Sequence, residues 1–302
     1  MKIKELKKLL TKFEKNIEFE KDLKKKKWFN IGGKAKIFYK ANSLKELINF
    51  LKILNNEERI FVLGAGSNIL ISDNLFDGII IKLSKNFSNI SLHSEDIVIA
   101  GAGALDKSVS HFTMKNNLSG FEFMSGIPGT IGGGIRMNAG CFGKEFKDIL
   151  ISIQAIDKRG NIITIPSKDI EFDYRKSNLS DNLIFLSASF KGVKSKTKKI
   201  KFEIDKLKLQ KEQNQPSKVK TGGSTFKNPT LQSKKKVWEL IQECVPLNMR
   251  FGDACISDKH SNFFVNKGNA TFEDMKKLID YVTDKVFQKT GVSLEKEIKI
   301  LE

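Results

Sequence analysis

The chain has 302 residues, enough for two domains of ordinary size. Apolar residues make up 40% and charged residues 29% of the chain, a composition typical of a globular protein that folds in water. No apolar run approaches the roughly 20 residues that cross a bilayer, and the basic N-terminus lacks the apolar core of a signal peptide. We therefore expect a cytoplasmic protein that does not associate with a membrane.

The cysteines and histidines show no pattern of a disulfide framework or a metal site. There are three of each, with no CxxC pair and no HExxH motif: Cys141, Cys244 and Cys255, and His93, His111 and His260. We expect free, buried thiols and no bound metal.

The formal net charge of +18 raises the possibility of a nucleic-acid-binding protein. Only five of the 53 basic residues are arginines, and the lysines are spread along the chain without a recognisable nucleic-acid module. We interpret the charge as a lysine-rich solvated surface that also attracts phosphorylated small molecules, and we expect no nucleic-acid partner.

The N-terminal two thirds of the chain combine helices with short, glycine-separated strands. Apolar residues at helical spacing predict an amphipathic helix within residues 1–23. Two more helices are predicted at 43–54, with Ser43 as N-cap, and at 104–116. Strand-like segments lie around these helices, at 37–40, 59–63, 78–83, 96–103, 151–157 and 161–166.

The pattern changes near residues 194–215, which we take as the boundary between domains. A lysine-rich segment there precedes a predicted helix at 202–216. Beyond it we predict a helix at 233–244, short strands within 255–266, and a long helix at 271–290 that Gly291 ends.

The stretch RIFVLGAGSNILIS, residues 59–72, contains a glycine turn that resembles part of a dinucleotide-binding motif. Gly64 and Gly66 have the spacing of the first two glycines of GxGxxG, but Ile69 occupies the third position. The residues that follow favour a strand, whereas a Rossmann loop opens a helix. The motif alone is equally consistent with a tight hairpin or a bulge.

A second glycine-rich stretch, SGIPGTIGGGIRMNAGCFG, holds seven glycines in residues 125–143. Glycine permits close approach of the backbone to a ligand, and successive N–H groups form anion sites. The alternative is a flexible linker, but apolar residues that would anchor the segment in a core are interleaved with the glycines: Ile127, Ile131, Ile135, Met137 and Phe142. We interpret the segment as a cofactor-contacting loop.

With both glycine segments in place, the chain resembles the UDP-N-acetylenolpyruvoylglucosamine reductase (MurB) family, in its shorter subtype. Six blocks match that family in order over nearly the whole chain. They are WFNIGGKA at 28–35, LSGFEFMSGIPGTIGGGIRMNAGCFG at 118–143, FDYRKS at 172–177, GGSTFKNP at 222–229, SDKHSNFFVN at 257–266 and GVSLEKEIKIL at 291–301.

The resemblance implies an α+β fold, with a vanillyl-alcohol-oxidase-type (PCMH-like) FAD-binding module and a smaller α+β substrate-binding domain. We place the module, with two subdomains, at 1–195 and the substrate domain at 196–302. The family's reaction reduces UDP-N-acetylglucosamine enolpyruvate to UDP-N-acetylmuramate for peptidoglycan synthesis, with FAD bound and NADPH as co-substrate. We expect a monomer. Another flavoenzyme of this fold is the main alternative, although the blocks at 172–177, 222–229 and 291–301 are not required by an FAD module alone.

The resemblance also implies three catalytic residues. Arg175 would hold the substrate carboxylate, Ser224 would protonate the carbon next to it, and Glu297 would hydrogen-bond the same carboxyl region. Without the family, Arg175 would be read as half of a surface ion pair and Ser224 as a turn residue. Glu295 is the alternative carboxylate, because residues two apart on a strand share a face.

The remaining implied residues bind the cofactor and the substrate. FAD would be contacted by Gly64, Ala65, Gly66, Ser67, Asn68, Ile69, Ser125, Gly126, Ile127, Pro128, Gly129, Thr130, Gly132, Gly133, Asn138, Ala139 and Gly140. The substrate would be contacted by Tyr174, by Lys227 at a phosphate, by Asn228, and by His260, for which a structural role is the alternative.

Overall fold

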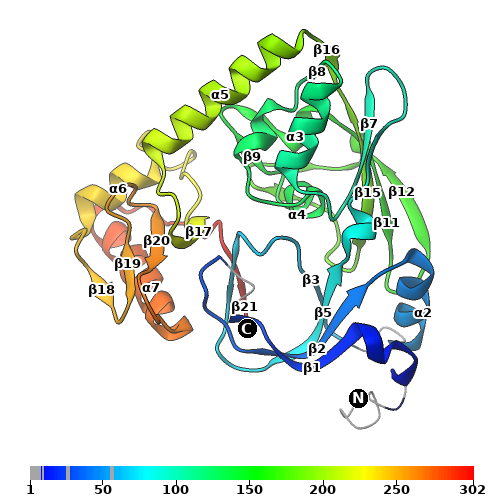
Figure 1. The fold of residues 1–302 in the computed structure, drawn as a ribbon. Helices are drawn as coiled ribbons and strands as arrows, with labels where there is room; N and C mark the ends of the chain where they lie inside the picture. The colour runs from blue at the N-terminus through cyan, green and yellow to red at the C-terminus, as the bar shows by residue number, and fades with distance from the viewer. Residues whose placement is uncertain (1–7, 9, 25–27, 55–57) are drawn as a thin grey trace. The chain divides into compact units, whose positions relative to one another are not determined.

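The computed structural model describes residues 8, 10–24, 28–54 and 58–302, which form two compact units (Figure 1). Unit 1 comprises residues 1–20, 36–65 and 77–211, and unit 2 comprises 21–35, 66–76 and 212–302. This division differs from the boundary that we expected at 195/196. Residues 196–211 lie in unit 1, and two N-terminal segments lie in unit 2.

The first part of unit 1 is built on a four-stranded sheet in the order β1-β2-β5-β3. Its strands are β1 (Ile17–Asp22), β2 (Lys34–Ala41), β5 (Phe76–Leu83) and β3 (Ile60–Val62), and its helix is α2 (Leu44–Leu54). Phe13, Tyr39 and Phe50 form a ring cluster in the core of this part, with the Tyr39 and Phe50 rings stacked at 3.8 Å between centroids. The Ser43 hydroxyl accepts the Glu46 N–H at 3.2 Å, which confirms the predicted N-cap of α2.

The predicted N-terminal helix is wrong over residues 17–22. The structure has a 3-10 helix, η1 (Thr11–Asn16), followed by β1. Ile17 and Phe19 alternate with the exposed Glu18 and Glu20, so the local pattern has the period of a strand. Residues 1–7 and 9, on which the helical spacing partly rested, lie outside the described residues.

The second part of unit 1 is a five-stranded sheet with helices α3 and α4 against one face (Figure 1). In sheet order the strands are β12 (Ile162–Pro166), β11 (Leu150–Ile156), β15 (Ile184–Lys191), β7 (Ile97–Gly101) and β6 (Ile90–Leu92). The helices are α3 (Asp106–Lys115) and α4 (Ile131–Arg136). Shorter pairs are β8 (Leu118–Ser119) with β16 (Val193–Lys194), β9 (Gly140–Cys141) with β10 (Lys144–Glu145), and β13 (Phe172–Asp173) with β14 (Lys176–Ser177). Short 3-10 helices occur at η3 (Lys85–Phe87), η4 (Glu122–Gly126), η5 (Phe146–Asp148) and η6 (Ser167–Asp169).

The helix predicted at 202–216 begins earlier than its apolar residues suggest. It is α5 (Thr197–Asn214), which takes in most of the lysine-rich segment and buries only Ile200. Asn117 accounts for the early start, because its Oδ1 accepts the Thr197 N–H at 3.2 Å as well as the Thr197 hydroxyl at 2.7 Å.

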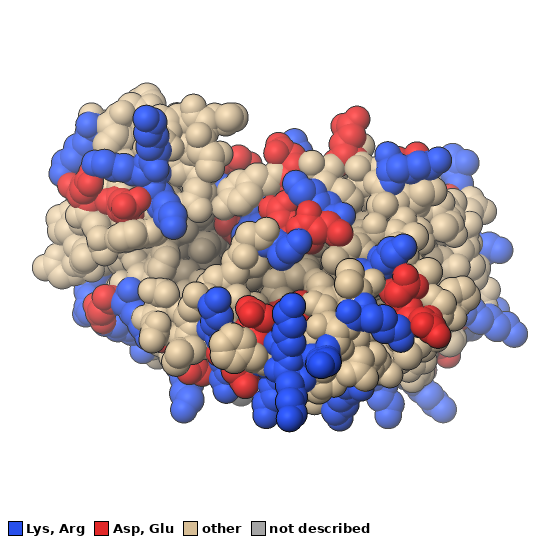
Figure 2. Space-filling view, turned by 90° about the horizontal axis from the view of Figure 1, so that it is seen from above, with Lys and Arg blue, Asp and Glu red and all other residues tan. Residues whose placement is uncertain are grey.

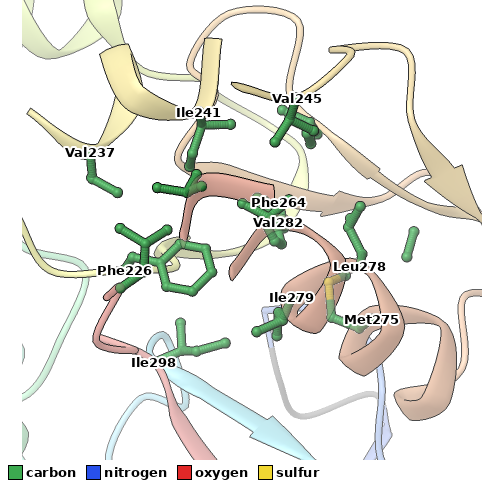
Figure 3. Close-up of a cluster of buried hydrophobic side chains, with 14 of the residues drawn as sticks. Phe226, Val237, Ile241, Val245, Phe264, Met275, Leu278, Ile279, Val282 and Ile298 are labelled. Atoms are coloured by element: carbon green, nitrogen blue, oxygen red, sulfur yellow. The ribbon is translucent and has the colours of Figure 1, made fainter. Parts of the chain in front are cut away.

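Unit 2 packs two helices on a four-stranded sheet in the order β17-β20-β19-β18. The strands are β17 (Lys220–Ser224), β20 (Phe263–Asn266), β19 (Ala254–Ile256) and β18 (Arg250–Phe251), and the helices are α6 (Val237–Cys244) and α7 (Phe272–Thr290). Figure 3 shows the core between them, where Phe226 and Phe264 meet edge to face at 5.8 Å. Gly291 has φ +72° and ends α7, as predicted.

The glycine turn of residues 64–68 connects two strands, as the sequence predicts, but it is not a hairpin. β3 pairs in parallel with β5, whereas the strand after the turn, β4 (Ile69–Ile71), pairs in parallel with β21 (Lys299–Leu301) near the C-terminus. The two flanking strands therefore belong to different sheets, and the hairpin alternative is wrong.

Both units mix helices with mainly antiparallel strands, so the fold is α+β, as expected. Within the described part of the chain, no helix has the length and apolarity to cross a membrane. Over the same residues, no three His, Cys, Asp or Glu side chains are grouped to hold a metal ion. Figure 2 shows acidic side chains among the lysines and arginines on the face in view.

Candidate active site

The two glycine-rich segments meet inside unit 1. A Cβ atom added to Gly64 would lie 2.7 Å from the Thr130 hydroxyl oxygen, so a larger residue at 64 would require the Thr130 side chain or the segments themselves to shift. Lysines from other elements bond both segments. Lys82 Nζ of β5 donates to the Gly64 carbonyl, and Lys211 Nζ of α5 donates to the Gly126 carbonyl at 2.5 Å.

The stretch 125–143 is an anchored loop and helix, so the flexible-linker alternative is wrong. Ile131 and Ile135 on α4 are fully buried, and Ile127 packs against the same core. Arg136 donates to the carbonyls of Leu179, Ser180 and Leu183 at 2.7–2.8 Å. Phe142 is 46% exposed and so does not anchor the segment, because it sits in the exposed turn between β9 and β10 with φ +53°.

Arg175 lies in the two-residue turn between β13 and β14, also in unit 1. Its φ of +56° is in the left-handed region, which costs a non-glycine residue about 1 kcal/mol or more. Its side chain is only 17% exposed. Arg175 Nη2 donates to the Gly140 carbonyl at 3.0 Å, and the guanidinium lies 4.9 Å from the Tyr174 ring centre. The turn thus holds a strained, mostly buried cation beside the glycine-rich segment.

Ser224 ends β17 in unit 2, directly after an irregularity in the strand pairing. The register with β20 shifts between Thr221 and Ser224, and such bulges redirect a side chain. Gly222 belongs to the shifted segment, where a Cβ atom would lie 2.2 Å from the Phe29 ring. The half-buried Ser224 is therefore set by backbone geometry that a larger residue at 222 would disrupt.

The fold brings Glu297 next to the strand end that carries Ser224. The Glu297 N–H donates to the Thr225 carbonyl at 2.8 Å. The Asn68 side chain donates to the Glu297 carbonyl at 3.0 Å, so part of the first glycine turn joins this group. Thr225, Asn68 and Glu297 all belong to unit 2.

Glu295 and Glu297 differ in environment, although the sequence did not separate them. The segment 295–297 is not a strand; only Lys296 forms an isolated bridge, with Phe226. The Glu295 side chain is 71% exposed and pairs with Lys227 Nζ at 2.6 Å. Glu297 is half-buried. The Glu295 carboxylate is thus exposed and paired with Lys227, whereas Glu297 is less exposed and its backbone N–H bonds the Thr225 carbonyl.

Asn228 and His260 make structural contacts in unit 2. The Asn228 side-chain oxygen accepts the Val237 N–H at 3.1 Å, at the start of α6. His260 Nδ1 accepts the Asn262 N–H at 3.2 Å, and its ring lies 4.8 Å from that of Phe263. Burial lowers the pKa of His260, so the neutral imidazole with a proton on Nε2 is favoured at pH 7.

Comparison with known proteins decides the family. The C-terminal domain model of UDP-N-acetylenolpyruvoylglucosamine reductase matches residues 215–301, and an FAD binding domain model matches 35–166. A protein of Pelagibacter ubique named UDP-N-acetylenolpyruvoylglucosamine reductase is 57% identical over 302 residues, all of both chains. The chain belongs to the UDP-N-acetylenolpyruvoylglucosamine reductase family. A Rickettsia massiliae protein of the same name is 44% identical over 93% of this chain and 95% of its own.

A solved structure supports the same assignment. The crystal structure of UDP-N-acetylenolpyruvylglucosamine reductase (MurB) from Thermus caldophilus superimposes with a TM-score of 0.81 at 29% identity. The match covers 95% of this chain and 98% of that one. As a member of the MurB family with an FAD binding domain, the chain is an FAD-dependent oxidoreductase.

The residues of unit 1 fit the FAD of a MurB protein. Residues 64 and 65 lie in a bend outside the strands, against Thr130 of the second glycine-rich segment. Glycine has no Cβ atom and lets the backbone of a loop come close to a ligand. Backbone N–H groups in such a loop can donate hydrogen bonds to a pyrophosphate. The ammonium groups of Lys82 and Lys211, which bond the Gly64 and Gly126 carbonyls, add positive charge beside the two segments.

Sequence reasoning missed three polar side chains near these MurB segments. They are Lys82 and Lys211, which bond the glycine-rich segments, and Glu145, which faces Arg175. Lys82 and Lys211 stand 18 and 85 residues from their partners, so no short motif contains both ends of either contact. Glu145 lies two residues beyond the matched block at 118–143, and this nearness was the signal in the sequence that could have pointed to it.

Proposed function

We propose that this chain reduces UDP-N-acetylglucosamine enolpyruvate to UDP-N-acetylmuramate, with NADPH as the electron donor, in the cytoplasm and as a monomer. The observation that carries the proposal is the 57% identity, over the whole of both chains, to a protein named UDP-N-acetylenolpyruvoylglucosamine reductase. Unit 1, which contains most of the FAD binding match, would be the cofactor module. The part of unit 2 matched by the reductase C-terminal model would bind the substrate.

The proposed roles follow from the chemistry of an enol ether joined to a carboxylate. When bound by the two glycine-rich segments, FAD would supply the hydride chemistry, with NADPH as the reductant and the terminal vinyl carbon as the acceptor. Arg175 holds the substrate carboxylate, which becomes more electron-rich as the hydride arrives, so the guanidinium binds it most strongly at that point. Ser224 donates the proton to the neighbouring carbon, which is a very strong base at that moment.

Glu297 would hydrogen-bond the same carboxyl region. Close approach of two carboxyl groups requires that they share a proton, so this interaction depends on Glu297 being at least partly protonated. The lower exposure of Glu297 supports its choice over Glu295, whose side chain is exposed and paired with Lys227.

For FAD, we propose the two glycine-rich segments with the residues expected from the sequence. For the substrate, we propose Tyr174, which already stacks on Arg175, and Lys227, whose ammonium would meet a phosphate. Asn228 and His260 are weaker ligands in this scheme, because each already has a structural partner.

Replacing Gly64 with alanine is expected to weaken FAD binding about tenfold to a hundredfold. The added Cβ would lie 2.7 Å from the Thr130 hydroxyl, so the two segments must separate. Quenching of FAD fluorescence by the apoprotein measures the affinity. The double variant Gly64→Ala/Thr130→Ala removes the clashing hydroxyl and should bind FAD no worse than Thr130→Ala alone. If the double variant instead loses FAD affinity by the product of the two single losses, the clash with Thr130 is not the cause of the weaker binding.

Replacing Glu295 with glutamine is expected to lower the KM for the UDP substrate about two- to fivefold, because an exposed ion pair of this size competes for the Lys227 ammonium. The kcat should not change. The control is Glu243→Gln, which breaks the comparable exposed pair of Lys235 and Glu243. An unchanged or raised KM in Glu295→Gln would remove Lys227 from phosphate binding.

The proposed function itself is tested on the purified protein. Its absorption spectrum should show a bound flavin, and UDP-N-acetylglucosamine enolpyruvate should trigger oxidation of NADPH. A protein that stays colourless after incubation with FAD would refute the cofactor assignment. A flavoprotein that consumes NADPH without response to this substrate would instead be a different oxidoreductase of the same fold.

A further inference from the structure

The turn that carries Arg175 has little stability of its own. Each strand of the β13–β14 pair is two residues long, and Arg175 has a left-handed φ of +56°. Isolated two-stranded pairs of this size are at best marginal in water, and a strained conformation persists only where surrounding contacts determine it. The position of the guanidinium therefore depends on side-chain contacts outside the turn.

The Glu145 carboxylate faces this guanidinium. Glu145 Oε1 lies 3.6 Å from Arg175 Nη1, and the two side chains are 19% and 17% exposed. A tight charge-assisted hydrogen bond has an N···O distance of about 2.7–2.9 Å. At 3.6 Å the Glu145 carboxylate attracts the Arg175 guanidinium, but it does not form the short, paired hydrogen bonds of a bidentate ion pair.

Glu145 is itself held from the other side. Its second oxygen, Oε2, accepts the Asn138 side-chain amide at 2.9 Å and pairs with Lys147 Nζ at 3.0 Å. Asn138 is fully buried, and its amide also donates to the Asp173 carbonyl at 3.1 Å, one residue before the turn. The Asn138 oxygen accepts the Lys147 N–H at 3.1 Å. These contacts join the glycine-rich segment to the Arg175 turn.

We propose that Glu145 is a positioning residue for Arg175. Anchored through Oε2, it directs Oε1 at the guanidinium and keeps it in the orientation that receives the substrate carboxylate. This inference rests on the role given to Arg175 in the proposed function.

The test is Glu145→Gln in the FAD-loaded enzyme, followed in separate half-reactions. Glutamine keeps the shape and the contact with Asn138 but loses the charge that faces Arg175. We expect flavin reoxidation by the enolpyruvyl substrate to slow about tenfold at saturation, with an unchanged or lower half-saturating concentration. The FAD content, the visible spectrum, the melting temperature and the rate of flavin reduction by NADPH should match the wild type.

The matched control is Glu95→Gln. Glu95 carries an exposed carboxylate of unit 1, with Oε2 3.9 Å from Lys194 Nζ, and its side chain is 91% exposed. Both half-reactions should stay within about twofold of the wild type, the range expected for an exposed pair. A loss as large as that of Glu145→Gln would show that the effect does not depend on the carboxylate that faces Arg175.

A double variant separates positioning from an independent role. If Glu145 acts through Arg175, Arg175→Lys/Glu145→Gln should reoxidise no more slowly than Arg175→Lys alone. Three results would each overturn the inference. The first is a double variant whose reoxidation is slowed by the product of the two single losses, and the second is normal reoxidation in Glu145→Gln. The third is equal damage in Glu145→Gln to the flavin content and to both half-reactions. Failure of the proposed function would appear already in the wild type, whose reduced flavin would not respond to the substrate.

Discussion

Replacing Ser224 with alanine is expected to slow reoxidation of the reduced flavin by UDP-N-acetylglucosamine enolpyruvate about a hundredfold to ten-thousandfold, the range typical of a lost general acid. Reduction of the flavin by NADPH should continue at the wild-type rate, because that step needs no proton on the substrate carbon. Stopped-flow absorbance of the flavin measures the two half-reactions separately.

Two further substitutions test whether the serine proton is the cause. Ser224→Cys retains a donor at the same bulge of β17 and should recover part of the rate. Ser233→Ala removes a hydroxyl that accepts the Lys235 N–H, away from the segment that carries Ser224, and should change neither half-reaction. Wild-type reoxidation in Ser224→Ala would exclude Ser224 from the mechanism.

Replacing Arg175 with lysine is expected to slow the same reoxidation about a hundredfold, the cost typical of losing one donor to a developing anion. Lysine keeps the positive charge but lacks the planar fork that binds a carboxylate through paired N–H groups. It also cannot reproduce both the Gly140 hydrogen bond and the Glu145 contact of Arg175. Single-turnover reoxidation at saturating substrate measures the loss.

The neighbouring Lys176 provides the control for Arg175→Lys. It is exposed at the start of β14, so Lys176→Met changes the charge of the same turn without touching the guanidinium. We expect wild-type half-reactions in Lys176→Met. If Arg175→Lys instead reoxidises normally, a simple positive charge suffices, and the paired binding of the carboxylate is refuted.

Local features of the fold were predictable because their signals are local. Ser43 as the N-cap of α2, Gly291 at the end of α7, and a glycine turn followed by a strand at 64–71 all follow from residues within a few positions of one another. The family blocks likewise indicated the family, which the FAD binding domain model and the reductase C-terminal model confirm. The N-terminal helix failed where η1 and β1 meet, because β1 gains its stability from pairing within the sheet.

By itself, the sequence determined the fold class and the family, since motifs and periodicity are written in consecutive residues. Only the tertiary structure decided which distant residues meet. β4 pairs with β21 across more than 200 residues, Glu295 is committed to Lys227, and Glu145 faces Arg175. Such contacts depend on packing and charge between separate segments, and no local pattern of residue types specifies the partner.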